Sequence, residues 1–153
     1  MRDITKAIIH CSATKEGVDL DVEDIRKMHK KRGWSDIGYH FLIKLDGTIE
    51  KGRPISIMGA HVRGHNKDSV GIVYIGGLDE KGKAKDTRTT AQQSSLLSLL
   101  NSIAMIFPIK EIKGHRDYSK DLDGDGVVES HEWMKQCPCF DAQDEYKFLL
   151  NNK

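Results

Sequence analysis

The sequence predicts a single α/β domain in which a mixed central β-sheet is flanked by helices. Short runs rich in Val and Ile alternate along the chain with helical repeats of apolar residues, which is typical of layered α/β folds. A glycine turn joins two neighbouring strands, so the sheet should not be purely parallel. The 153 residues fit one domain, and the chain shows no internal repeat or low-complexity linker.

The first strand is expected at residues 6–12, where side chains alternate between two faces. Ile8 and His10 would face one side, and Ile9 and Cys11 the other. His10 and Cys11 are therefore not expected to bind the same metal ion.

A helix and a hairpin are expected next. Asp21 is a suitable helix N-cap, and Gly33 follows the last apolar residue of the helical repeat. The apolar residues of that repeat are Val22, Ile25 and Met28. Residues 39–44 and 48–51 are predicted to pair as strands, with Gly47 in the left-handed position of the turn.

The second half predicts a strand, a long helix and a further strand. Residues 69–75 are rich in Val and Ile, and two glycines follow them. Thr90 and Gln93 match a capping box that would begin the helix. Its apolar stripe would contain Leu96, Leu97, Leu100, Ile103, Ala104 and Phe107. Residues 109–113 form the next predicted strand, and a last helix is expected from Asp141.

Charge and hydropathy exclude several classes of protein. Lys and Arg number 24 against 23 Asp and Glu, a net charge of +1, without the basic excess typical of nucleic-acid binders. The basic run at 29–32 is interpreted as a solvated helix end. No apolar run approaches the roughly 18 residues of a membrane span, and no signal peptide is visible.

The cysteines and two histidines are candidates for a metal site. Three cysteines are too few for a disulfide scaffold, so they indicate a reducing compartment, a metal or both. His115 and Cys137 offer nitrogen and sulfur ligands of the kind that zinc prefers, and His10 is the leading third candidate. Three protein ligands would leave a position for water, which is the catalytic pattern.

Each of these residues also has an ordinary structural interpretation. A single histidine in a strand is most often a satisfied core or surface residue, and the same applies to His29, His40, His65 and His131. The pair formed by Cys137 and Cys139 could be a buried thiol and a bystander, or a strained disulfide.

An acidic segment at 121–132 matches the EF-hand calcium loop in full. Its six candidate oxygen ligands are Asp121, Asp123, Asp125, Val127 through its carbonyl, Glu129 and Glu132. Gly126 supplies the sharp turn of the pattern, but a clear entering helix is missing. The alternative is an acidic surface turn that binds no ion. If calcium is bound, we expect a structural role.

Five segments together resemble one known family. They are HCSAT at 10–14, GWSDIGYHFLIKLDGTIEKGR at 33–53, GAHVRGHNKDSVGI at 59–72, GHRD at 114–117 and KQCPCFD at 135–141. In this order they resemble the type 2 N-acetylmuramoyl-L-alanine amidases, close to the phage-lysozyme branch. That family also includes the peptidoglycan recognition proteins. The resemblance covers residues 6–150 and implies a zinc amidase fold.

The resemblance also implies roles for individual residues. His10, His115 and Cys137 match the zinc ligands, and Cys139 falls where the family needs no thiol. Tyr39 and Lys135 match a catalytic pair, in which the tyrosine assists proton transfer and the lysine stabilises the oxyanion. His61 and Asn66 match a segment of the substrate groove. Without the resemblance, Tyr39 could simply pack and Lys135 could be an exposed lysine.

The leading hypothesis is a zinc-dependent amidase, a domain spanning residues 1–153 with a calcium-loop-like insertion at 121–132. It would cleave the bond between N-acetylmuramic acid and L-alanine in peptidoglycan. The alternatives are a recognition module that holds muropeptides without cutting them, and a calcium-responsive interaction protein. The three residues Tyr39, Lys135 and Cys137 favour the enzyme, because such binders commonly lack the cysteine. We expect a monomer that is made in the cytoplasm and reaches the cell wall as a phage or prophage lysin.

Overall fold

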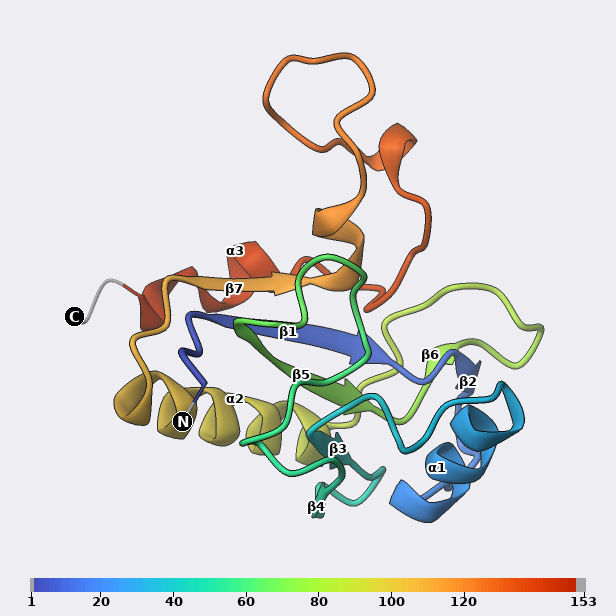
Figure 1. The fold of residues 1–153 in the computed structure, drawn as a ribbon. Helices are drawn as coiled ribbons and strands as arrows, with labels where there is room; N and C mark the ends of the chain where they lie inside the picture. Colours follow the sequence, from blue (N-terminus) through green and yellow to red (C-terminus); the bar gives the residue numbers. More distant parts are fainter. Residues whose placement is uncertain (1, 151–153) are drawn as a thin grey trace.

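A mixed β-sheet forms the centre of the molecule (Figure 1). In the computed structural model, which describes residues 2–150, the strands of this sheet lie in the order β4, β3, β5, β1, β7. Their bounds are Ile49–Lys51 for β4, Phe41–Ile43 for β3, Ser69–Tyr74 for β5, Lys6–Cys11 for β1 and Glu111–Gly114 for β7. The predicted mixed α/β architecture is confirmed.

The directions of the strands decide where a site can form. β3, β5, β1 and β7 run parallel, and only the hairpin partner β4 is antiparallel. The carboxyl ends of β1 and β7 therefore meet at one edge of the sheet, where ligands commonly bind in open α/β sheets. The hairpin turn has Gly47 at φ +89°, as the sequence predicts. A short parallel pair, β2 (Thr14–Lys15) and β6 (Gly77–Leu78), was not predicted.

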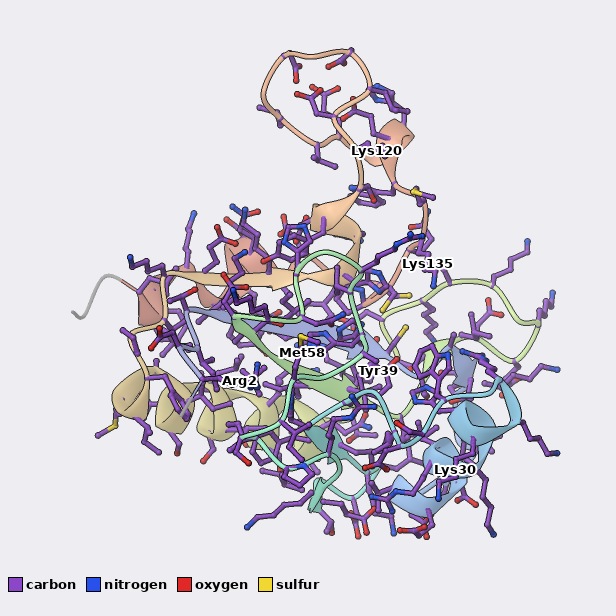
Figure 2. All side chains as sticks on the ribbon, viewed as in Figure 1. Arg2, Lys30, Tyr39, Met58, Lys120 and Lys135 are labelled. Carbon is purple, nitrogen blue, oxygen red and sulfur yellow. The ribbon has the colours of Figure 1, made fainter. Side chains whose placement is uncertain are left out.

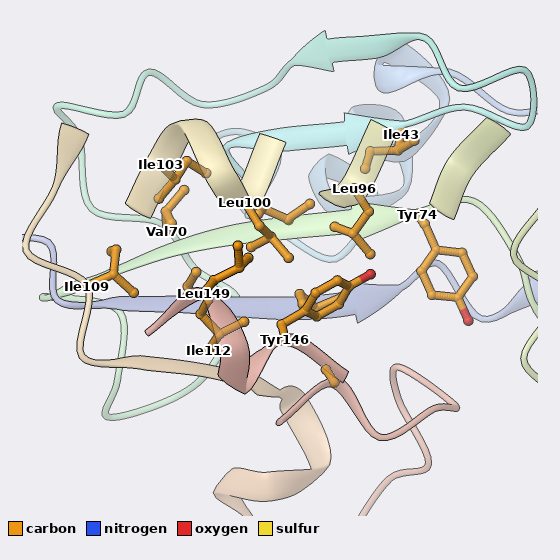
Figure 3. Packing of buried hydrophobic residues seen from close by; sticks show 14 of the residues in the cluster. Ile43, Val70, Tyr74, Leu96, Leu100, Ile103, Ile109, Ile112, Tyr146 and Leu149 are labelled. Carbon is orange, nitrogen blue, oxygen red and sulfur yellow. The ribbon is translucent and has the colours of Figure 1, made fainter. Parts of the chain in front are cut away.

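The larger core lies between one face of the sheet and the helices α2 (Thr90–Ile106) and α3 (Ala142–Tyr146). Figure 3 shows Ile103 of α2 beside Val70 of β5, and Leu96 nearer to Tyr74 at the other end of the same strand. Tyr146 and Leu149 pack into the same cluster from α3 and the 3₁₀ turn η3 (Lys147–Leu149). Ile9 and Cys11 of β1 belong to this core, which confirms the predicted alternation along the first strand.

A smaller core on the other side involves α1 (Val22–Lys31). Asp21 caps this helix as predicted, in a capping box with Asp24. The predicted apolar face was wrong at one position, because Met28 is 40% exposed whereas His29 is buried. His29 is therefore not part of a solvated basic run. Its Nδ1 accepts a hydrogen bond of 2.9 Å from the Gly38 amide, so the ring is tied to the loop that contains Gly38.

Two details of the second half differ from the sequence prediction. The capping box of α2 is formed by Thr89 and Gln92, one residue earlier than predicted. Gln92 also donates from its amide to the carbonyls of Ile43 and Ile75. These contacts with the sheet explain why the capping box begins at Thr89 rather than at Thr90. Leu97 is 42% exposed, because it lies at the outer edge of the helical stripe.

The chain after η1 (His115–Tyr118) leaves the sheet and forms a projecting loop that includes η2 (Ser130–Glu132) before it returns to Cys137 (Figure 1). Most of the loop is exposed, including Leu122 and Met134. Among residues 2–150, no helix has the length and apolar character needed to cross a membrane.

The buried His29 predicts acid-sensitive stability. Burial lowers the pKa of His29 to about 4, with smaller contributions from Arg32 and Arg53, whereas an unfolded histidine titrates near 6.5. The unfolded chain therefore binds the extra proton first. Neutral His29 therefore contributes fully to the free energy of unfolding above pH 6.5. As the pH falls towards 4, the free energy of unfolding should decrease by on the order of 2–3 kcal/mol.

Urea unfolding from pH 7.5 to 4.5 would measure this effect. His29→Asn keeps an acceptor near Nδ1 for the Gly38 amide but does not titrate, so its unfolding free energy should fall less with pH than that of the wild type. Parallel curves for the two proteins would contradict the assignment.

Candidate metal centre and active site

Three predicted ligands converge at the carboxyl edge of the sheet. His10 comes from the end of β1, His115 follows β7 directly, and Cys137 comes from the segment that returns from the projecting loop. One ligand atom from each lies within 4.8 Å of the others. The rings of His10 and His115 have centroids 4.9 Å apart. Two imidazoles and a thiol at this spacing fit a zinc ion with an open fourth position.

Backbone hydrogen bonds hold Cys137 against the two histidine segments. The amide of Cys11 donates to Sγ of Cys137 over 3.2 Å. The amide of Arg116 donates to the carbonyl of Cys137 over 2.8 Å. Because Cys11 follows His10 and Arg116 follows His115, each bond places the cysteine beside one histidine. An amide N–H directed at sulfur also favours its anionic, metal-binding form.

Close packing behind Cys137 fixes the same segment. A Cβ atom at Gly114 would lie only 2.4 Å from Cδ of Pro138, so only glycine allows this approach. The hydroxyl of Tyr74 donates to the carbonyl of Pro138 over 2.6 Å. The residue after Cys137 is thus held by the ends of β5 and β7.

Burial keeps both histidines neutral, which is the form that binds metal. Desolvation lowers the pKa of His10 well below its usual value, and the neighbouring His61, His115 and Lys135 add to this effect. Desolvation, followed by the charge of Lys135, lowers the pKa of His115 to about 4. His115 and Lys135 line the same pocket, so the lysine cation lies close to the candidate metal site.

Tyr39 and Lys135 flank the three ligands. The ring of Tyr39 lies 4.9 Å from that of His10, centroid to centroid, and backs onto the ring of His29 at 5.4 Å. The ring of Trp34 also packs against His29, with centroids 4.4 Å apart. Tyr39 precedes β3 rather than opening a strand, since β3 begins at Phe41.

Burial raises the pKa of Tyr39 well above its usual value, so its hydroxyl stays protonated and can donate. In Figure 2, Lys135 lies on the returning arm of the projecting loop, above Tyr39 in this view. A pocket of about 120 Å³ lies beside His115, with Met134 and Lys135 from the returning arm in its wall.

The two residues predicted to bind substrate are His61 and Asn66. They contact each other, and His61 also contacts the candidate ligand His10. His61 is only 9% exposed, and its Nδ1 lies 2.8 Å from Nε2 of His10. The side-chain oxygen of Asn66 accepts hydrogen bonds of 2.9 Å from the amides of His61 and Val62. These contacts shape the loop that carries His61. Substrate binding by the two side chains stays a prediction.

The other two cysteines form a separate contact. Sγ of Cys11 lies 3.9 Å from Sγ of Cys139, and Cys139 donates to the carbonyl of Gly77 over 3.3 Å. The hydrogen bond with Cys137 is the largest factor raising the pKa of Cys11 to about 12, and contact with Cys11 raises that of Cys139 well above its usual value. Both stay thiols, and all three cysteines are free of disulfides.

Only part of the predicted calcium ligand set comes together. Oxygens of Asp121, Asp123 and Glu132 lie within 4.8 Å of one another, at positions 1, 3 and 12 of the loop. The buried Glu132 carboxylate already accepts from the amides of Leu122, Asp123 and Glu129. The remaining candidates, Asp125, Val127 and Glu129, lie outside this group. Glu129 instead lies 3.5 Å from His131, which also lies 3.7 Å from Asp123.

Comparison with known proteins identifies the family. The model of the N-acetylmuramoyl-L-alanine amidase family matches residues 1–139. The chain belongs to this family. The amidase is 40% identical to the endolysin of Escherichia phage T7 and 38% identical to that of Enterobacteria phage K11. Each alignment spans 93% of this chain and 85% of the relative.

Solved structures agree with this assignment. The N-acetylmuramoyl-L-alanine amidase LysC from Clostridium intestinale superposes with a TM-score of 0.75 at 30% identity, over 98% of this chain and 87% of that one. The recognition protein PGRP-SA of the bumblebee superposes with a TM-score of 0.70 at 25% identity, over 96% and 85%. The chain is therefore an N-acetylmuramoyl-L-alanine amidase in fold and activity.

The glycine beneath the cysteine segment provides a test of the site. Gly114→Ala should force Pro138 away, lower the free energy of unfolding by about 1–3 kcal/mol and weaken metal binding, because Cys137 moves with its neighbour. Lys113→Ala, with a side chain that reaches the surface, is the matched control and should change stability by about 0.5 kcal/mol or less. Urea unfolding and competition with a zinc chelator measure the two effects; wild-type values for Gly114→Ala would refute the packing argument.

Proposed function

We propose that this amidase is a zinc-dependent hydrolase of peptidoglycan that cleaves the amide between N-acetylmuramic acid and L-alanine and acts as a lysin. The single observation that carries the proposal is the convergence of His10, His115 and Cys137 at one point of the sheet edge. The family match and the endolysin relatives support the substrate class.

The residues present fit zinc. The donor set of two imidazoles and one thiol has the softness and number of a catalytic zinc site, and the Cys11 amide supports a sulfur anion. When bound, the ion would polarise the scissile carbonyl and make hydroxide available near neutral pH.

The remaining chemistry falls to residues of the chain. The protonated hydroxyl of Tyr39 can donate a hydrogen bond to the reacting group and take part in proton transfer near His10. The ammonium of Lys135 would face the negative charge that develops on the carbonyl oxygen, which is where a fixed cation lowers the barrier most. Lys135 lies two residues before Cys137, whose carbonyl is held by the Arg116 amide, so the same contact helps to position the lysine.

The recognition-module alternative is weaker because the chain retains a complete ligand set together with Tyr39 and Lys135. A pure binder would have no use for three convergent candidate metal ligands next to a half-buried phenol and a cation. We attribute the similarity to the bumblebee recognition protein to the shared fold.

Substitution of the two neighbouring cysteines separates the proposed ligand from its neighbour. Cys137→Ser should lose zinc and at least about 100-fold in activity, whereas Cys139→Ser should keep both, because only Cys137 lies within reach of both histidines. Zinc content by atomic absorption and release of L-alanine amino termini from purified cell wall are the measurements. Equal activity of Cys137→Ser and wild type would defeat the mechanism.

Lys135→Ala should retain zinc but lose about 100- to 1,000-fold in kcat, the usual cost of removing an oxyanion donor. Lys120→Ala removes a cation at the other end of the projecting loop and is the matched control. A loss of zinc from Lys135→Ala, or unchanged kcat, would contradict the electrostatic role.

We also propose that calcium orders the projecting loop. The support is the complete sequence pattern and the approach of Asp121, Asp123 and Glu132, which occupy positions 1, 3 and 12 of the EF-hand loop. The carboxylate of Asp121 accepts from the amides of Gly124 and Gly126, which preforms the turn. Such a loop would hold the two arms that lead from His115 to Lys135.

Removing two of these carboxylates tests the idea. Asp121→Ala combined with Asp123→Ala should abolish any rise in melting temperature when calcium is added to calcium-free protein, while zinc content stays constant. Asp144→Ala, an exposed carboxylate on α3, is the control. Identical melting temperatures for wild-type protein with and without calcium would rule out the proposal.

A further inference from the structure

A chain of buried polar side chains runs from the metal centre into the sheet. Nε2 of His10 lies 2.8 Å from Nδ1 of His61, and Nε2 of His61 lies 3.1 Å from Oγ of Ser69. The exposed fractions are 1% for His10, 9% for His61 and 0% for Ser69. Water therefore does not compete for these contacts, and each group depends on its neighbour in the chain.

The contact at Nε2 determines which nitrogen of His10 can bind a metal. An imidazole has two nitrogens, and in its neutral form one donates and the other accepts. Since Nε2 is engaged with His61, Nδ1 remains for the ion shared with His115 and Cys137. A lone pair on Nδ1 requires the proton to lie on Nε2, which then donates to Nδ1 of His61. His61 in turn donates from Nε2 to the hydroxyl of Ser69.

The fold makes room for His61 in this position. A Cβ atom on Gly71 of β5 would lie 2.7 Å from Cγ and Cδ2 of the His61 ring, and one on Gly59 would lie 2.8 Å from Cδ2. Two glycines thus form the slot that the ring occupies. Asn66 holds the backbone of His61 from the other side through two hydrogen bonds. A ring with both nitrogens engaged and two glycines packed closely against it is better suited to orient His10 than to contact a substrate.

We propose that His61 is a positioning residue that orients His10 so that its Nδ1 faces the metal. This inference rests on the proposed zinc site and deepens it. A partner that holds the second nitrogen of a histidine ligand fixes its ring and tautomer, and its loss typically costs 10- to 100-fold in metal affinity. The substrate role predicted for His61 from the sequence is replaced by one exerted through His10.

His40 provides a matched control. It is as buried as His10, and its Nδ1 accepts from the Gly71 amide over 3.0 Å while its Nε2 donates to the Ile57 carbonyl over 2.8 Å. Its Nε2 also lies 3.3 Å from the Arg2 guanidinium, and its ring lies 6.0 Å from that of His61, but neither of its nitrogens is bonded to His10. Loss of the His40 side chain should destabilise the fold without changing how His10 is held.

The test measures zinc affinity by chelator competition on folded protein. His61→Leu should bind zinc about 10- to 100-fold more weakly than wild type, whereas His40→Leu should bind it like wild type. His61→Asn places an amide oxygen near the position of Nδ1, which can accept from His10, and should recover most of the affinity. The visible spectrum of the cobalt-substituted protein should shift for His61→Leu and return towards wild type for His61→Asn.

Several results would overturn the inference. Wild-type zinc affinity in His61→Leu with a raised KM for muropeptide would restore the substrate-contact role. Equal losses in His61→Leu and His40→Leu would reduce the effect to general destabilisation. If His61→Leu does not fold, Ser69→Ala replaces it; it removes only the hydroxyl at the end of the chain and should weaken zinc binding by a smaller factor. Unchanged affinity in Ser69→Ala would then overturn the inference.

Failure of the inference can be distinguished from failure of the zinc proposal. If wild-type protein binds zinc and Cys137→Ser loses it, the site stands, and the His61 variants decide the positioning role alone. If wild-type protein binds no stoichiometric zinc, or Cys137→Ser keeps it, both proposals fall together.

Discussion

The return of the chain to the sheet at Cys137 is the contact on which the rest of the site depends. The backbone amides of Cys11 and Arg116 donate hydrogen bonds to this residue, and they lie at the ends of two neighbouring parallel strands. Its neighbour Pro138 fits against Gly114, where no side chain would fit. Because both histidines precede those amide donors, one anchoring contact sets the geometry of three candidate ligands separated by more than a hundred residues of sequence.

The same anchor explains how the chain accommodates a long projecting loop. His115 and Cys137 are held by the sheet independently of the residues between them, so the intervening segment can leave the domain and return. Arg116 adds a second clamp at the base, since its guanidinium stacks on the ring of Trp133 at 3.8 Å. The anchored base also holds Lys135, which lies two residues before Cys137.

Burial keeps the histidines around the site neutral. His10, His40 and His61 are buried together, and desolvation lowers the pKa of each, so three imidazoles stay neutral at neutral pH. Neutral rings can bind metal and form directional hydrogen bonds to one another without repulsion. The protonated phenol of Tyr39 lies half-buried beside these rings, whereas the cation of Lys135 is exposed on the returning arm.

The sequence by itself determined the fold class, most of the strands and the identities of the candidate ligands. Alternation along β1 separated His10 from Cys11, and the glycine turn established a mixed sheet, because both depend on local chain geometry. The calcium-loop pattern was also visible, though it could not show that only Asp121, Asp123 and Glu132 approach one another. Tertiary structure decided what local patterns do not encode: the burial of His29, the earlier cap at Thr89 and the engagement of His61 with His10. Each of these depends on packing between segments that are distant in the sequence. The residues next to a histidine do not show which side chain or glycine will lie against its ring in the folded chain.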